Sequence, residues 1–397
     1  MTDAAQRQEA LVALLHEAES ASEPIIEAFA RVPRHRFLPD VPLEVAYTDD
    51  AIVTHDEGGV PTSSSSQPSL MARMLEQLAV GPGDRVLEVG AGTGYNAALL
   101  ATLGAAVTTV ELQAAVADAA RSNLAAAGIP LADGRPVAPG SVLVVTGDGA
   151  APPPGRYDRV IVTAGCWSLP AALVDALDDG GVIVAPLRIN GVELVLGLGR
   201  TDDVLRGQGA VPCGFMPLRG GDERPWRWQL GAGGVATADA DLGVEGRGAV
   251  DRLLAAPGRP VGDPLELAPD EHALSAVLWL GLQGDPVLSL VLPGHGPRPP
   301  WTLGLHVLPG SLLVIELAGR FDAVASARLH GGEAALRTCT AAMSAWRAAG
   351  APGPAALELT IARHRDRAGW SLPFPGNDGA VTMVRGAHRW TLRYVGA

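Results

Sequence analysis

Apolar and polar positions alternate along residues 85–197 in a pattern that predicts a parallel sheet with helices between its strands. Apolar runs of strand length occupy residues 86–89, 107–110, 142–146, 159–163 and 181–185. Stretches with helical spacing of apolar residues occupy 96–103, 114–127 and 169–177. Strands that alternate with helices predict the α/β class, here a doubly wound, Rossmann-like sheet.

The pattern differs on either side of this core. Before it we expect helices at 5–19, 24–31 and 69–79, and a polar loop from 41 to 68 with a short extended piece at 51–54. After it, alternating runs at 312–317, 355–361 and 390–395 predict antiparallel strands with one exposed face, and helices are expected at 269–281 and 332–349. We therefore divide the chain into N-terminal helices with a substrate loop (1–80), the core (81–222) and a separate C-terminal α+β domain (223–397).

The first core strand leads into a glycine-rich turn. Residues 84–95 read Asp-Arg-Val-Leu-Glu-Val-Gly-Ala-Gly-Thr-Gly-Tyr. Glycines at such a turn let the backbone approach a ligand closely, although Tyr95 stands where a dinucleotide fingerprint has its last glycine. Glu111 follows Gly90 by roughly twenty residues, the offset at which an acid accepts hydrogen bonds from ribose hydroxyls. An ordinary strand-to-helix turn is the alternative, but with Glu88 the spacing resembles the S-adenosylmethionine (SAM) site of class I methyltransferases.

Several polar residues fall at the carboxyl ends of the expected strands. Glu111, Asp148 and Thr163 each end or directly follow one, as do the glycines after Val89. Ligands of doubly wound sheets bind beyond these strand ends. The strand ends therefore predict one shared crevice.

The amino-acid composition excludes several classes of function. A net charge of −13 at pH 7 excludes a binding mode based on clustered cations, so we expect no nucleic-acid partner. All 30 basic residues are Arg, which excludes a lysine Schiff base. Three cysteines far apart and scattered histidines predict neither disulfides nor a metal site. Without a signal pattern or a membrane-length apolar run, we expect a cytoplasmic protein with no membrane partner.

A set of motifs then resembles the protein-L-isoaspartate O-methyltransferase family. The motifs are Val-Pro-Arg-His-Arg-Phe-Leu-Pro at 32–39, Ser-Ser-Ser-Gln-Pro at 64–68, the glycine turn, Gly-Asp-Gly at 147–149 and Phe-Met-Pro-Leu at 215–218. They occur in the family's order, and the resemblance covers roughly residues 23–221. The family uses SAM to esterify the side-chain carboxylate of isoaspartate in peptides, and the ester collapses to a succinimide.

The resemblance implies roles for individual residues. Ser66 is expected to orient the acceptor carboxylate by hydrogen bonds, helped by Ser65. Serines 63–66 alone would be typical of a flexible loop, but the following Gln67-Pro68 favours a functional turn. Asp148 resembles the acid that meets the adenine amino group, while Asp49 and Asp50 suit either substrate contact or a turn cap. The expected SAM contacts are Glu88, Gly90, Gly92, Thr93, Gly94, Glu111, Leu112, Asp148, Gly149, Gln67 and Thr163.

The long C-terminal region departs from the small repair enzymes. Together with the serine run and Cys-Gly-Phe-Met-Pro-Leu at 213–218, it resembles the FxLD-type subgroup that accompanies ribosomally made modified peptides. That resemblance implies a modified, cyclised precursor peptide as partner, methylated on a normal Asp to give aspartimide or isoaspartate. General isoaspartate repair and a non-catalytic SAM-binding scaffold remain the alternatives.

Overall fold

The computed structural model describes residues 3–18, 21–58, 60–220, 226–239, 241–268, 271–293, 301–307, 310–318, 323–364, 369–371, 374–375 and 380–395. None of the helices in these ranges is both long and apolar enough to cross a membrane. The N-terminal part consists of α1 (Asp3–Glu17), α2 (Glu23–Arg31), η1 (Arg34–Phe37), α3 (Leu43–Ala46), β1 (Ile52–Glu57), β2 (Val60–Ser65) and α4 (Pro68–Leu78).

The core has the predicted doubly wound arrangement. Its elements are β3 (Arg85–Val89), α5 (Tyr95–Thr102), β4 (Ala106–Glu111), α6 (Ala114–Ala126), β5 (Ser141–Thr146), β6 (Tyr157–Val162), α7 (Ala171–Ala176), β7 (Leu177–Ile189), β8 (Val192–Thr201), β9 (Val204–Gln208) and β10 (Val211–Pro212). Strands β5, β4, β3, β6 and β7 lie side by side and run parallel. The fold class predicted from the sequence is confirmed.

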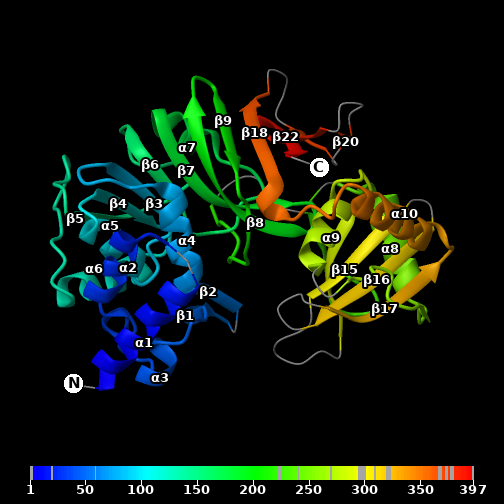
Figure 1. Ribbon diagram of the computed structural model, residues 1–397, viewed down its shortest axis with the longest axis horizontal. Helices are drawn as coiled ribbons and strands as arrows, with labels where there is room; N and C mark the ends of the chain where they lie inside the picture. The colour runs from blue at the N-terminus through cyan, green and yellow to red at the C-terminus, as the bar shows by residue number, and fades with distance from the viewer. Residues whose placement is uncertain are drawn as a thin grey trace.

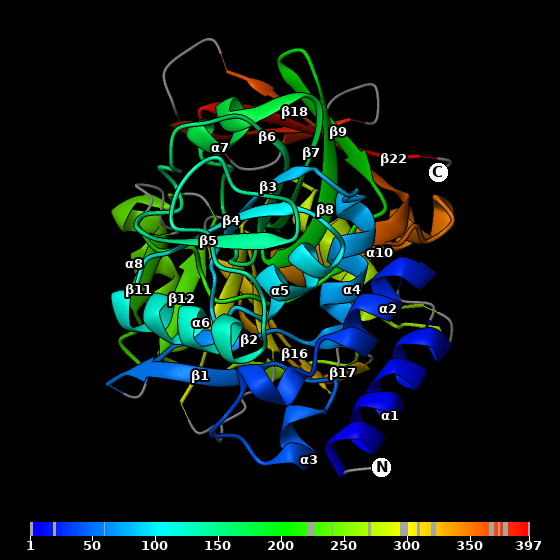
Figure 2. The same cartoon turned by 90° about the vertical axis from the view of Figure 1, so that its left-hand side faces the viewer.

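Both faces of this sheet are buried because apolar residues occupy successive positions of each strand. Val86 and Ile161 pack with helices α2, α4 and α5, whereas Leu87 and Val160 pack on the opposite face. Successive side chains of a strand point to opposite faces, so one apolar run serves two layers. Figure 2 shows α4, α5 and α6 on one side of β3, β4 and β5.

The C-terminal region contributes two sets of strands. One sheet contains β11 (Trp226–Gln229), β12 (Val235–Ala238), β13 (Arg259–Pro260), β14 (Val287–Val291), β15 (Trp301–Val307), β16 (Ser311–Ala318) and β17 (Ala323–Gly331), with α8 (Gly243–Leu254), α9 (Ala273–Gly281) and α10 (Ala334–Ala348). We call residues 226–348 the appended unit. The chain then continues through η2 (Pro354–Ala356), β18 (Leu357–Arg363), β19 (Gly369–Trp370), β20 (Phe374–Pro375), β21 (Val381–Gly386) and β22 (His388–Tyr394).

The last strands return to the core sheet, which corrects the expectation of a wholly separate C-terminal domain. β18 pairs antiparallel with β9, and β22 and β21 follow it outward. Figure 1 shows these orange and red strands beside β9, with the appended unit in yellow at the right. The apolar core is also continuous, because Leu187 and Leu194 of the β7–β8 hairpin belong to one cluster with Val277 of α9. A division at residues 222 and 223 therefore separates neither the sheet nor the core.

A buried carboxylate joins the appended unit to the core sheet. Asp239, just after β12, is 1% exposed. Its Oδ1 accepts hydrogen bonds from Arg188 Nε at 3.0 Å and Trp167 Nε1 at 3.2 Å, and its Oδ2 accepts one from Gly191 N at 3.1 Å. Its backbone oxygen accepts a hydrogen bond from Arg385 Nη1 of β21 at 2.8 Å. Three segments of the chain thus meet at one residue.

Replacing Asp239 by Ala should lower the free energy of unfolding by on the order of 3–5 kcal/mol, because it leaves buried guanidinium groups without their carboxylate. The control is Asp175→Ala, which breaks the exposed Asp175–Arg363 pair and should cost no more than about 1 kcal/mol. Urea unfolding of both variants measures the difference. Equal losses in the two variants would show that Asp239 is not an anchor.

Candidate active site

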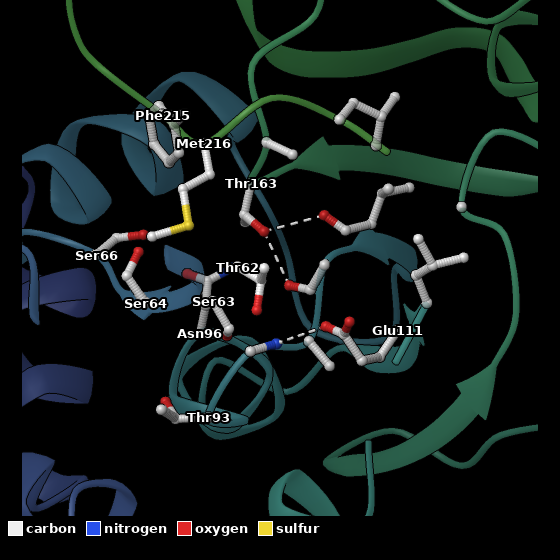
Figure 3. Close-up of a pocket in the computed structure, with 18 of the residues that line it drawn as sticks. Thr62, Ser63, Ser64, Ser66, Thr93, Asn96, Glu111, Thr163, Phe215 and Met216 are labelled. Carbon is white, nitrogen blue, oxygen red and sulfur yellow. Dashed lines mark hydrogen bonds between the residues drawn. The ribbon is translucent and has the colours of Figure 1, made fainter. Parts of the chain in front are cut away.

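The candidate site lies where the order of the parallel strands reverses. The chain runs outward from β3 to β4 and β5 and then returns to β6 on the other side of β3. Thr163, after β6, joins the two strand ends, because its Oγ1 lies 2.9 Å from Val89 O and 2.8 Å from Gly90 O (Figure 3). Gly90 has φ +94°, and a Cβ there would lie 2.5 Å from Thr163 Oγ1. Only glycine fits this position.

Glu111 closes one end of the cavity. The residue is 8% exposed, and its two carboxylate oxygens accept hydrogen bonds from the backbone N–H groups of Gly92 and Gln113, each at 3.1 Å. Each carboxylate oxygen can accept more than one hydrogen bond, so further lone pairs remain for a ligand. The carboxylate is thus fixed in place by the turn that it faces.

The serine run is a strand and not the loop that the sequence suggested. β1 and β2 pair as an antiparallel hairpin, and Ser63, Ser64 and Ser65 belong to β2. Ser63 and Ser65 are buried, whereas Ser64 and Ser66 are partly exposed. Polar residues without a hydrophobic alternation gave no periodic signal of a strand.

The hairpin brings the serines over the glycine turn. A Cβ on Gly92 would lie 3.3 Å from Ser64 O. Figure 3 shows Ser64 and Ser66 beside Met216 at one end of the cavity and Glu111 toward the other. Within the described part of the chain, Ser65 Oγ is buried without a hydrogen-bond partner. These features leave a polar cradle that a ligand can fill.

Asp49 fixes the turn between the hairpin and α4. Its Oδ1 accepts from Ser69 N at 2.8 Å, and its Oδ2 accepts from Ser69 Oγ at 2.8 Å and Gln67 Nε2 at 2.9 Å. This arrangement satisfies a backbone donor in the first turn of the helix. Of the two roles open for Asp49, the structure favours the cap, while Asp50 lies in the wall of a neighbouring groove.

Two hollows meet at Ser66. The first, which we call the cofactor cavity, encloses about 860 Å³ including its open mouth and contains the glycine turn and Glu111. The second, the acceptor groove, passes between the hairpin, the start of α4 and residues 211–216. His272 and Leu274, at the start of α9, line the same groove. Both hollows are lined by Ser64, Ser66, Phe215 and Met216.

The structure brings most of the expected site residues together. The cofactor cavity is lined by Ser65, Ser66, Gly90, Gly92, Thr93, Glu111, Leu112, Gly149 and Thr163. Gln67 instead lines the acceptor groove, and Asp148 lines a third hollow beside the cofactor cavity, where its Oδ1 accepts a hydrogen bond from Ala150 N. Gly94 allows α5 to approach α6, because a Cβ there would lie 3.1 Å from Leu124.

Glu88 lies beneath the cavity and not in its wall. It is fully buried, and Asn96 Nδ2 donates a hydrogen bond to its Oε1 at 2.8 Å. Burial raises the pKa of the Glu88 carboxyl to about 7. Glu88 therefore supports the turn from below, which differs from the direct cofactor contact expected from its position in the motif.

Sequence reasoning missed Ser64, Met216 and Arg219. Arg219 reaches back to the hairpin, with Nη2 3.5 Å from Thr62 O and Nη1 3.9 Å from Glu57. An extended backbone at the serine run would have predicted Ser64 as a site residue together with Ser66, because residues two apart in an extended segment point to the same side. Nothing in the sequence pattern placed Met216 between the two hollows.

The fold and this cavity define a class I SAM-dependent methyltransferase. Glycines that admit close backbone approach, a fixed carboxylate after β4 and an unpartnered buried hydroxyl suit a bound nucleoside with a charged tail. The family profile described as protein-L-isoaspartate(D-aspartate) O-methyltransferase (PCMT) matches residues 6–223. The chain belongs to this family, and its cofactor is S-adenosyl-L-methionine.

Similar proteins carry the same description. A protein-L-isoaspartate O-methyltransferase of Methanoculleus marisnigri is 39% identical over 207 residues, which cover 50% of this chain and 84% of the relative. One from Roseiflexus sp. is 35% identical over 221 residues, covering 55% and 94%. A solved structure of a protein-L-isoaspartate O-methyltransferase covers 89% of this chain and 96% of its own, with 22% identity and a TM-score of 0.49.

Replacing Glu111 by Ala should weaken SAM binding by about 10- to 100-fold, which is the change in affinity expected when a hydrogen bond to a charged group is lost. The variant loses the acceptor expected for the ribose hydroxyls and also the partner of Gly92 N. Asp118→Ala on the exposed surface of α6 is the control and should bind normally. Calorimetry gives the dissociation constants. Unchanged affinity in a folded Glu111→Ala protein would show that the ribose is bound elsewhere.

Proposed function

We propose that the protein methylates a side-chain carboxylate of an aspartyl or isoaspartyl residue in a peptide, at Ser66. One observation carries the proposal: Ser66 lines both the cofactor cavity and the acceptor groove. A group held at this serine can reach both hollows. The same position suits the functional hydroxyl implied by the family resemblance.

The chemistry asks little of the protein beyond alignment. A carboxylate is ionised near neutral pH and is already a nucleophile, so no proton has to be removed. The cofactor supplies an electrophilic methyl group, and its transfer to the carboxylate oxygen leaves a neutral thioether. Ser66 is partly exposed and lines both hollows, so its hydroxyl is available to donate to the second carboxylate oxygen. Alignment of this kind contributes up to about 7–11 kcal/mol in intramolecular models.

We further propose that the acceptor is a normal Asp in a modified, cyclised peptide, and that its ester leads to aspartimide or isoaspartate. The support is the far wall of the groove, where His272 and Leu274 come from the appended unit, outside the family match at 6–223. A peptide bound there would contact this unit as well as the serines. A rigid ring loses less conformational entropy on binding than a linear peptide.

General repair of isoaspartate in linear peptides is the second candidate, and the family membership supports it equally. The three cysteines are unpaired, which suits action in a reducing cytoplasm. A scaffold without chemistry would not need a free hydroxyl between two hollows.

Replacing Ser66 by Ala should leave SAM affinity intact and lower kcat by about 10- to 100-fold, because the carboxylate loses a hydrogen-bond donor. Ser65→Ala should be milder, since Ser65 does not line the groove. Turnover with radiolabelled SAM and calorimetry separate the two effects. A Ser66→Ala enzyme with the wild-type kcat would refute the assignment.

The wild-type enzyme should methylate an Asp in a cyclised peptide encoded beside its gene better than the same peptide in linear form. Mass spectrometry should then show a methyl ester followed by loss of methanol. A linear isoaspartyl peptide is the comparison substrate. Efficient methylation of unrelated linear isoaspartyl peptides, with no reaction of the cyclised Asp peptide, would establish repair instead.

A further inference from the structure

A single acid on β8 contacts the segment that divides the two hollows. Residues 213–218 pass between the cofactor cavity and the acceptor groove, and Phe215 and Met216 line both. Glu193 Oε1 accepts a hydrogen bond from Phe215 N at 2.7 Å, and Glu193 O accepts one from Cys213 N at 3.0 Å. Phe215 N is thus held by a side chain and not by a neighbouring strand.

Gly165 fastens the other end of this segment. Gly165 N donates to Met216 O at 2.8 Å, and Leu218 N donates to Gly165 O at 2.9 Å. A Cβ on Gly165 would lie 2.9 Å from Glu193 Oε2. Gly165 is therefore small where the carboxylate needs space, and the two residues hold the dividing segment together.

We propose that Glu193 is a positioning residue for methyl transfer, whose carboxylate fixes residues 213–218 between cofactor and acceptor. The proposal rests on the function proposed above, since it concerns the alignment of the same two groups. Glu193 does not line either hollow and acts through Phe215. Phe215 N is bonded by the buried Glu193 carboxylate and not by a backbone oxygen. A buried side-chain acceptor of this kind can fix a loop to within fractions of an ångström, which is the precision that catalysis requires.

The charges around Glu193 are arranged to keep it in place. Arg188 of β7 lies directly opposite it in the β7–β8 ladder, and Asp239 of the appended unit binds the same guanidinium. Cys213 Sγ lies 3.8 Å from Oε1, and the buried Cys166 is also nearby. Burial raises the pKa of the Glu193 carboxyl to about 7, while the Phe215 N–H and Arg188 oppose that rise. The position of the acid is thus coupled to the appended unit through Arg188.

The test uses three full-length single variants and one double variant. Glu193→Gln keeps an oxygen acceptor for Phe215 N and should retain kcat within about threefold, whereas Glu193→Ala should lower kcat on the order of 100-fold, as expected for a misplacement near 1 Å. Gly165→Ala should resemble Glu193→Ala by displacing the carboxylate. The double variant Glu193→Ala/Gly165→Ala should have a kcat close to that of either single variant, because both substitutions remove the same hydrogen bond.

Amide hydrogen exchange of residues 213–218 provides a readout that needs no substrate. Exchange at Phe215 should accelerate at least about tenfold in Glu193→Ala and Gly165→Ala, and not in Glu193→Gln. If wild type methylates no peptide, the proposed function fails, while the exchange data still decide the role of Glu193. Two results would overturn the proposal. One is a folded Glu193→Ala enzyme with the wild-type kcat. The other is a Glu193→Gln enzyme whose kcat falls as far as that of Glu193→Ala while the exchange at Phe215 stays normal.

Thermal unfolding at two pH values checks that the acid is enclosed. The pKa of the Glu193 carboxyl is about 7 in the folded protein, against 4.5 for an ordinary carboxyl. Protonated Glu193 therefore contributes its full stabilisation of the fold below pH 4.5, and this contribution is lost as the pH rises through 7. Glu193→Gln cannot ionise. The Tm of Glu193→Gln minus that of wild type should therefore be larger at pH 8 than at pH 5. An unchanged difference would show that the Glu193 carboxyl is not enclosed.

Discussion

Arg188 of β7 lies near two enclosed acids, Asp239 and Glu193, and its positive charge acts on both. Asp239 holds it from the appended unit at 3.0 Å, and Glu193 faces it across the β7–β8 ladder. A charge removed from water needs partners, and here those partners belong to different parts of the chain. The attachment of the appended unit and the positioning role proposed for Glu193 therefore involve the same guanidinium.

The strand that carries the serines borders both hollows. A strand presents alternate residues to opposite sides, so Ser63 and Ser65 are buried while Ser64 between them reaches the groove, together with Ser66 just after the strand. Short polar side chains allow both sides to remain open to a ligand. The hairpin is kept over the glycine turn by Arg219 and by Gln113, which donates a hydrogen bond to Glu57.

The sequence predicted the core well because its signals are local. The glycine turn, the acid ending β4 and the alternation of strands with helices each depend on neighbouring residues, and the fold class was confirmed. The return of β18 to β9 was not predictable, since alternation shows which face is buried but not which strand is the partner. The positions of Glu88 and Gln67 also depend on contacts with residues distant in sequence, such as Asp49.

The position of β9 has a consequence for synthesis of the protein on the ribosome. β9 pairs on one side with β8, but its partner on the other side, β18, begins only at Leu357, after the whole appended unit. At about 5–20 residues per second, the edge of β9 stays unpaired on the order of ten seconds or longer. Unpaired edges invite association with other chains. Arg206 and Gln208 on this strand keep the nascent edge hydrophilic until the C-terminus emerges and covers it.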